Sequence, residues 1–304
     1  MRKIALVYGN GRYKNIVKAL NLLREEIIER IKNKNKIVIK PNFVRTSVPL
    51  AATNVMAVKG ILDFLKQFNL SEITIAEGAF EGPTDRGYKE YGYYQILKNY
   101  PVKFVDLNND DYQEIEIKDS LTPQYFTTLK LKISKTILES DFRISVGPPK
   151  THESVGATLT LKNLVVGSII TQQREKDGNY WRGEIHQYGK RALGRILFYL
   201  AKIISPDLSV LDAFEGMEGD GPSFGEPVKM NLAIVGFDFV AVDSLGVYLM
   251  GFNPQKINYL RLCAENQLGE QDFSQLKIVG LRGDLEKYRQ NFRPNPQYPF
   301  SLKD

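Results

Sequence analysis

A histidine and two lysines in the middle of the chain have residue types that could transfer a proton and bind an anion. Lys150 and His152 follow residues 144–147, which we interpret as the end of a buried strand, and Lys162 and Asn163 interrupt an apolar run. Histidine titrates near neutral pH, and a nearby lysine can lower its pKa or hold a substrate anion. We predict His152, Lys150 and Lys162 as catalytic and Asn163 as substrate-binding. The alternative is a structural histidine and a lysine that reaches solvent.

Polar side chains also follow two other apolar segments. Lys40 and Asn42 flank a proline at the end of residues 36–40, and Glu77 follows residues 72–76. An ammonium and an amide at a strand end could hold a carboxylate or phosphate, so Lys40 and Asn42 are predicted substrate-binding residues. Glu77 could ligate a metal ion or orient Lys40. The alternative for all three is an ordinary polar turn.

An acidic, glycine-rich loop follows residues 208–211 and contains four carboxylates. Carboxylates on such a loop suit a hard divalent cation such as Mg²⁺ or Ca²⁺. The candidate metal ligands are Glu77, Asp212, Glu215, Glu218 and Asp220. The same carboxylates could instead pair with the lysines.

Two further ionisable residues lie apart from these groups. His186 belongs to a polar segment, residues 171–190, and is a candidate substrate-binding residue. Asp243 lies inside an apolar run, where a buried acid needs a partner. We expect a structural salt bridge or a hydrogen bond from helix to loop for Asp243.

The elements that must position these residues alternate between short apolar strands and amphipathic helices. This alternation predicts an α/β fold with a parallel or mixed sheet flanked by helices. Residues 155–161 suit either a strand or a short buried helix. The predicted strands lie at residues 4–8, 36–40, 72–76, 102–105, 144–147, 208–211, 231–235 and 277–279.

The length of 304 residues fits one large domain with ample core. We expect a single domain over residues 1–285, with residues 1–140 and 141–285 as alternative lobes. Residues 286–304 are expected to form an extended C-terminal tail.

The composition excludes several classes of protein. Cys263 is the single cysteine, so an intrachain disulfide, a four-cysteine zinc site and a cysteine-held iron–sulfur cluster are not expected within one chain. No apolar run approaches the roughly 20 residues that span a bilayer. The first residues have too short an apolar run for a signal peptide. We therefore expect a cytoplasmic protein without a membrane partner, and the oligomeric state stays open.

The net charge of +6 is unevenly distributed. Residues 1–40 contain 11 Lys and Arg against three Glu, a surplus of +8, which leaves about −2 for the remainder. A nucleic-acid groove usually gathers cations and stacking aromatic residues on one face. Most of these surplus cations lie along an expected helix and in a Lys-Asn run. A solvated face is therefore the favoured interpretation, and nucleic-acid binding is the lesser alternative.

Several of these segments, taken in order, resemble the family catalogued as domain of unknown function 362. The matching segments are residues 39–42, 77–78, 149–152, 161–167, 212–213, 216–222, 241–243 and 250–251. The resemblance implies an α/β protein whose activity is largely undefined. Many members of that family carry a ferredoxin-like tail with cysteine clusters. With a single cysteine in this sequence we do not expect such a tail, so electron transfer is not carried over. A fainter likeness to the nickel-pincer lactate racemase family would make His152 and Lys162 the counterparts of its histidine and lysine.

The sequence therefore favours an enzyme that acts on a small anionic molecule by proton transfer, as an isomerase or racemase does, or by metal-assisted chemistry. One alternative is a non-catalytic protein that binds a metabolite or cofactor in the same cleft. A second alternative is a nucleic-acid-associated protein that uses the basic N-terminal helix.

Overall fold

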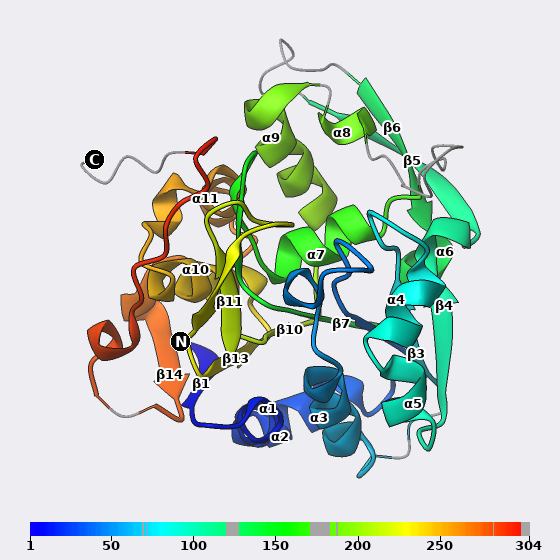
Figure 1. The fold of residues 1–304 in the computed structure, drawn as a ribbon, viewed down its shortest axis with the longest axis horizontal. Coiled ribbons are helices and arrows are strands. Elements are labelled where there is room, and N and C mark those ends of the chain that lie inside the picture. The colour runs from blue at the N-terminus through cyan, green and yellow to red at the C-terminus, as the bar shows by residue number, and fades with distance from the viewer. Residues whose placement is uncertain are drawn as a thin grey trace.

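A mixed sheet of eight strands forms the centre of the computed structural model, which describes residues 1–68, 70, 72–119, 128–170, 183–186, 188–281 and 283–298. The strand order is β14-β1-β13-β10-β7-β2-β3-β4, and Figure 1 shows β14 at the left of the sheet and β4 at the right. The strands are β1 (Arg2–Tyr8), β2 (Lys36–Lys40), β3 (Glu72–Glu77), β4 (Val102–Asp106), β7 (Phe142–Gly147), β10 (Leu208–Leu211), β13 (Leu232–Gly236) and β14 (Leu276–Val279).

The sheet is parallel over most of its width. Strands β10, β7, β2, β3 and β4 are parallel neighbours, whereas β13 is antiparallel to both β10 and β1. The prediction of an α/β fold with a parallel or mixed sheet is confirmed. The strands consist of nearly continuous apolar runs because helices cover both faces of the sheet.

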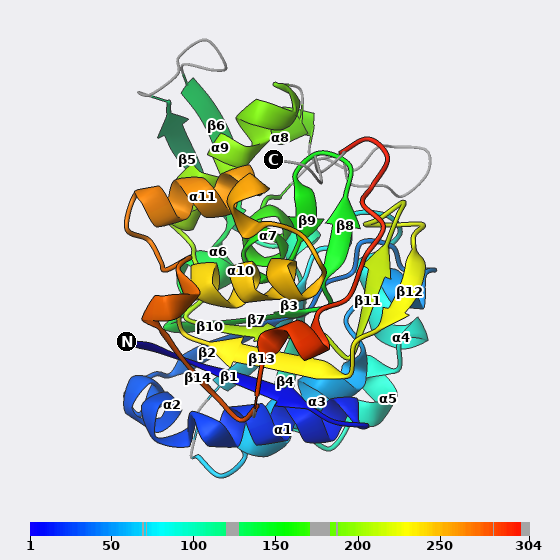
Figure 2. The same cartoon turned by 90° about the vertical axis from the view of Figure 1, so that its left-hand side faces the viewer.

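Two helical layers enclose the sheet, as Figure 2 shows, and each has its own hydrophobic core. One layer contains α1 (Arg12–Leu22), α2 (Arg24–Ile31), α3 (Val55–Leu65), α4 (Thr84–Glu90) and α5 (Tyr93–Leu97). The opposite layer contains α7 (Thr160–Gly167), α9 (Gly189–Ala201), α10 (Phe239–Leu249) and α11 (Asn258–Glu265), with the short α6 (Lys135–Leu138) and α8 (Gly183–His186) beside it.

Smaller elements extend the two ends of the molecule. A second sheet has the order β12-β11-β8-β9, and β5 pairs with β6. Their bounds are β5 (Tyr112–Lys118), β6 (Thr128–Ser134), β8 (Lys150–His152), β9 (Gly156–Thr158), β11 (Glu215–Glu218) and β12 (Glu226–Lys229). The 3₁₀ helices are η1 (Pro49–Ala51), η2 (Leu107–Asn109), η3 (Pro254–Lys256), η4 (Phe273–Gln275) and η5 (Leu285–Tyr288).

The structure refines the predicted elements at three places. The basic N-terminal helix is divided into two helices, α1 and α2, because the chain leaves helical geometry at Leu23. Residues 155–161, expected as either a strand or a short buried helix, contain the end of one strand and the start of one helix, since β9 ends at Thr158 and α7 begins at Thr160. The acidic loop after β10 contains the hairpin β11–β12.

Residues 1–140 and 141–285 contribute strands to the same central sheet. The described part of the tail begins in η5 and continues without helix or strand past the end of α10 and β11, where Phe292 N–H donates to Met250 O and Arg293 pairs with Glu218. None of the helices in the described ranges is long and apolar enough to cross a membrane.

Candidate functional site

A cavity of about 440 Å³ opens at the carboxyl ends of β2 and β3. The start of the loop after β2, the loop after β3, β8, α7, α8 and the turn of the β11–β12 hairpin form its walls. Seven of the predicted site residues line it: Asn42, Glu77, His152, Lys162, Asn163, His186 and Asp220. The carboxyl edge of parallel strands is where ligands bind in open α/β sheets.

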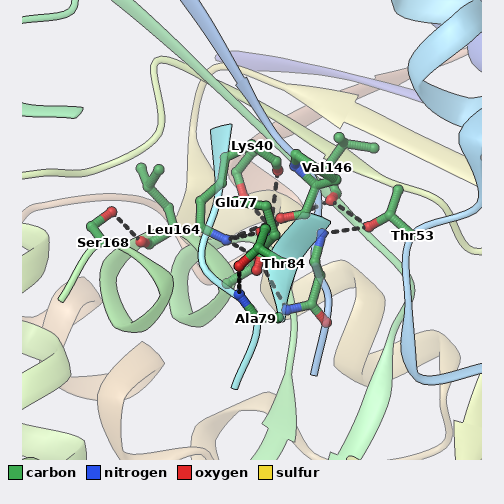
Figure 3. A network of polar contacts seen from close by, with 12 residues as sticks. Lys40, Thr53, Glu77, Ala79, Thr84, Val146, Leu164 and Ser168 are labelled. Atoms are coloured by element: carbon green, nitrogen blue, oxygen red, sulfur yellow. Dashed lines mark hydrogen bonds and ion pairs between the residues drawn. The ribbon is translucent and has the colours of Figure 1, made fainter. Parts of the chain in front are cut away.

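Lys40 and Glu77 form a buried ion pair next to this cavity (Figure 3). Lys40 Nζ donates to Glu77 Oε2 at 2.5 Å, to Asn163 Oδ1 at 2.9 Å and to the Pro41 carbonyl at 3.0 Å. The two side chains are 0% and 2% exposed. Three acceptors, one of them a carboxylate, match the three donors of an ammonium group. Glu77 therefore orients Lys40, which is one of the two roles considered for it.

Lys150 lies behind the cavity wall and is fully buried. Its Nζ donates to Asn42 Oδ1 and, at 2.6 Å, to the Ala51 carbonyl, and Asn42 Nδ2 donates to Asn163 Oδ1 at 3.1 Å. Burial, with repulsion from Lys162, lowers the pKa of Lys150 to about 7. Both of these acceptors are neutral oxygens, and a neutral amine has two N–H donors for them. Lys150 thus contacts the cavity through Asn42.

His152 lines the cavity as a neutral imidazole. Its Nδ1 accepts a hydrogen bond from Ser154 N–H at 3.0 Å. Burial, with the positive charge of Lys162, holds the pKa of His152 well below its ordinary value. Since Nδ1 is the acceptor, the ring proton is on Nε2, which is the atom that can donate to a ligand.

Helix α7 carries Lys162 and Asn163 to the cavity, and Asp243 fixes the start of that helix. Asp243 Oδ1 accepts from Thr160 N–H at 3.0 Å and from Thr160 Oγ1 at 2.6 Å, and Oδ2 accepts from Leu161 N–H at 3.0 Å. The partner of Asp243 is thus neither a cation nor a loop, as was expected, but the N-terminal turn of a second helix, α7. Burial raises the pKa of Asp243 to about 6.

The Asn163 amide connects the site to two strands. Its Oδ1 accepts from Lys40 and Asn42, and its Nδ2 donates to Ser145 Oγ at 3.0 Å and to the Lys40 carbonyl at 3.2 Å. Both ends of the Asn163 amide are engaged in hydrogen bonds within the protein, so Asn163 positions its neighbours. Asn42 donates one N–H of its amide to Asn163, and its second N–H can donate to a ligand.

The five candidate metal ligands are not gathered at one place. Asp212 pairs with Arg12 at 2.9 Å beside a second cavity that Glu215 also lines. Glu218 pairs with Arg293 at 2.7 Å. Asp220 lies exposed at the mouth of the first cavity.

This arrangement corrects the expectation of a shared carboxylate cluster. Alternate residues of β11 point to opposite faces of its sheet, and arginines from distant segments take up two of the carboxylates. Within the described ranges, no group of three or more His, Cys, Asp or Glu side chains is arranged to hold a metal ion.

The sequence interpretation missed the apolar part of the cavity wall. Phe43, Phe80 and Phe224 line the cavity, and so does Thr158, whose buried Oγ1 has no hydrogen-bond partner among the residues that the structure describes. Phe80 and Phe224 lie in loops that follow strands, as the polar candidates do. This position in the sequence could have identified them as residues of the cavity wall. Trp181 and most of the polar segment at 171–190 lie outside the described residues.

The basic N-terminal residues are partly neutralised where they lie. Lys3 pairs with Glu26, and Lys32 pairs with Glu29, each at 2.6 Å. Arg12 lies over the Phe214 ring and pairs with Asp212. These contacts agree with a solvated, ion-paired face.

Comparison with known proteins identifies the family. The model described as Domain of unknown function (DUF362) matches residues 37–248. The chain belongs to this family. The DUF362 range runs from β2 into α10 and includes every residue that lines the larger cavity except Asn295 and Gln297.

The chain is also similar to a curated protein and to solved structures. It is 25% identical over 242 residues to the thylakoid-associated protein sll1697 of Synechocystis sp., covering 79% of this chain and 70% of that protein. It resembles the lactate racemase apoprotein of Thermoanaerobacterium thermosaccharolyticum at 16% identity and a TM-score of 0.48, covering 77% of this chain and 54% of that one. A Thermotoga maritima protein matches at 15% identity and a TM-score of 0.46, covering 76% and 57%. The chain thus spans less than two thirds of either solved structure.

Proposed function

We propose that this DUF362 protein is an enzyme that binds a small anionic substrate in the 440 Å³ cavity and moves a proton on it. The observation that supports this most is that His152, Lys162 and Asn42 reach one cavity from β8, α7 and the end of β2. Large cavities with a few converging polar groups are the usual place for such chemistry.

Lys162 is the proposed proton carrier. Its ammonium form attracts the anion and then releases one proton to water. The resulting amine takes a proton from the carbon next to the substrate carboxylate, so that a C–H bond breaks and an N–H bond forms. The ammonium then returns the proton to the same face of the carbon or, once the planar intermediate has turned in the cavity, to the opposite face. The substrate composition is unchanged, which is the balance of an isomerase or racemase.

His152 is proposed as the group that stabilises the negative charge during this step. Its Nε2–H would donate to the substrate oxygen on which charge develops, and a neutral imidazole suits that role. Its Nδ1 is occupied by Ser154 N–H, so His152 donates rather than accepts a proton. Asn42 would add a second donor, and Lys150, through Asn42, acts as a positioning residue.

A divalent cation is not assigned to this step, because the carboxylates are paired with cations or dispersed. His186 lines the cavity and is proposed to bind substrate.

A cytoplasmic location is also proposed, and cell fractionation tests it. Recovery with membranes would oppose it and would agree with the name of the cyanobacterial relative.

The test is exchange of the α-proton of 2-hydroxy, 2-amino and aryl-substituted carboxylates in D₂O, followed by proton NMR. The wild type should exchange at least one of them. His152→Asn retains an oxygen acceptor for Ser154 N–H but lacks Nε2, so exchange should fall roughly 10²–10³-fold while affinity stays within about threefold. Lys162→Met should abolish exchange. Lys66→Met, on an exposed lysine outside the cavity, is the matched control.

A non-catalytic binding protein is the second candidate, and the hydrogen bond on Nδ1 favours it, because a histidine that can only donate also suits binding. Binding without exchange of any carboxylate would select this candidate over the enzyme.

A further inference from the structure

The larger cavity combines buried polar side chains with exposed aromatic rings at its mouth. Three buried residues of its wall are polar: His152 is 3% exposed, Lys162 is 7% exposed and Asn42 is 8% exposed. Two aromatic rings lie at the mouth beside the exposed Asp220, with Phe80 at 38% and Phe224 at 64% exposure. Two exposed rings on the wall of one cavity offer an apolar surface, which a ligand with an apolar outer end would cover.

Phe224 is held at the mouth by contacts with another segment. The Arg45 guanidinium lies over the Phe224 ring at 4.0 Å, and Arg45 is ion-paired with Glu81. Arg45 and Glu81 also form a β-bridge between the loops that follow β2 and β3. The turn of the β11–β12 hairpin therefore meets these loops, and the aromatic ring is placed beside the entrance.

The inner wall below the mouth is also apolar and firmly packed. Phe43 lines the cavity at 1% exposure, and its ring packs edge-on against Tyr88, Tyr91 and Tyr93 at 5.1–5.3 Å. Val166 lines the cavity from α7.

The size of the cavity leads to the same conclusion. At about 440 Å³ it lies in the range of roughly 300–1,000 Å³ that holds drug-sized ligands. A three-carbon acid would fill a small fraction of it and would leave the aromatic mouth in water.

We propose that the substrate is an amphipathic anion, a carboxylate that carries a ring-sized apolar group. The charged end lies against Lys162 and His152, and the apolar group lies between Phe80 and Phe224. This inference rests on the proposed function, because it assigns the substrate class of the same cavity. Phe224 is then a specificity-determining residue.

Calorimetric titration with three probes tests this: propionate, 3-phenylpropionate and the neutral 3-phenylpropanamide. We expect 3-phenylpropionate to bind roughly tenfold tighter than propionate, because the ring leaves water. In Phe224→Ala that advantage should fall to about threefold or less, while the Kd of propionate stays within about twofold. Phe237→Ala is the matched control, since Phe237 also lies under a guanidinium, that of Arg30 at 4.2 Å, but does not line the cavity.

The possible outcomes separate the two proposals. If propionate binds as tightly as 3-phenylpropionate, or if Phe224→Ala weakens both acids equally, the amphipathic substrate is refuted and the anion site stands. If the amide binds as tightly as the acid, and Lys162→Met has no effect on the acid, the anion site is refuted. Absence of binding by all three probes would refute both.

Discussion

The buried Lys40–Glu77 pair allows a quantitative prediction about the base of the cavity. Replacing Lys40 with methionine keeps the side-chain length but removes the donor of three hydrogen bonds. The Glu77 carboxylate, 2% exposed, would be left without its counter-charge. Breaking a buried pair in this way costs about 3–5 kcal/mol, a large part of the roughly 5–15 kcal/mol that stabilises a domain.

Glu77→Gln perturbs the pair from the other side. The amide oxygen can still accept from Lys40, and a buried lysine can respond by losing its proton. We expect a smaller loss, about 1–3 kcal/mol. Lys40→Met/Glu77→Gln removes both charges, so its loss should be smaller than the sum of the single losses by about 1–3 kcal/mol.

Urea unfolding of the four proteins, followed by circular dichroism, measures these free energies of unfolding. Lys3→Met is the matched control, because Lys3 lies 2.6 Å from Glu26 but the side chains are 31% and 40% exposed. An exposed pair of this kind is worth about 0–1 kcal/mol. If Lys40→Met costs no more than Lys3→Met, or if the losses of the single variants add without coupling, then the reasoning about the buried pair is refuted.

Three further predictions concern groups around the same cavity. Lys150 has a folded-state pKa of about 7 against an ordinary value of 10.5. Between these pH values the unfolded chain binds more protons than the folded protein, so the wild-type free energy of unfolding should rise with pH. Urea unfolding at several pH values measures this rise, and Lys150→Met should lack the part that Lys150 contributes. In Gly167→Ala the new Cβ would lie 2.3 Å from Lys40 Nζ. Thermal unfolding should show a loss of about 1–3 kcal/mol, whereas Gly11→Ala, with its nearest contacts at 3.6 Å, should be nearly neutral; equal effects would contradict the placement of Lys40. Asp243→Ala leaves two buried N–H groups of α7 without acceptors, so we expect a loss of about 2–4 kcal/mol in urea unfolding together with weaker binding of 3-phenylpropionate. Unchanged stability in that variant would argue against Asp243 as the anchor of α7.

The α/β class and the edge of the sheet that carries the site could be predicted from the sequence. Alternation of apolar strands and amphipathic helices is a local property of the chain, and it identifies parallel strands before any contact is known. Because such strands end at one edge, polar residues after strands were expected to meet. Asn42, Glu77, His152 and Lys162 do meet at one cavity.

The roles of individual residues were less predictable, because they depend on partners far away in the chain. Lys150 donates to Asn42 and Ala51, which lie 108 and 99 residues away, and this distinguishes it from Lys40, which is paired with a carboxylate. Both lysines lie at or just after the ends of predicted strands, and nothing in their sequence context shows which of them is paired with a carboxylate.

The carboxylates of the acidic loop show the same limit. Asp212 and Glu218 could have ligated a cation, but Arg12 and Arg293, 200 and 75 residues away, pair with them. Which cation meets a carboxylate depends on the packing of segments, and residue spacing carries no information on it.

Sequence by itself therefore determined the fold class, the family resemblance and the group of residues at one sheet edge, since these follow from local periodicity and from motifs in order. Tertiary structure alone decided which lysine is paired with a carboxylate, which histidine nitrogen can donate and that aromatic rings lie at the mouth of the cavity. The physical reason is that charge state and hydrogen-bond capacity depend on burial and on partners, and both arise only when distant segments pack together.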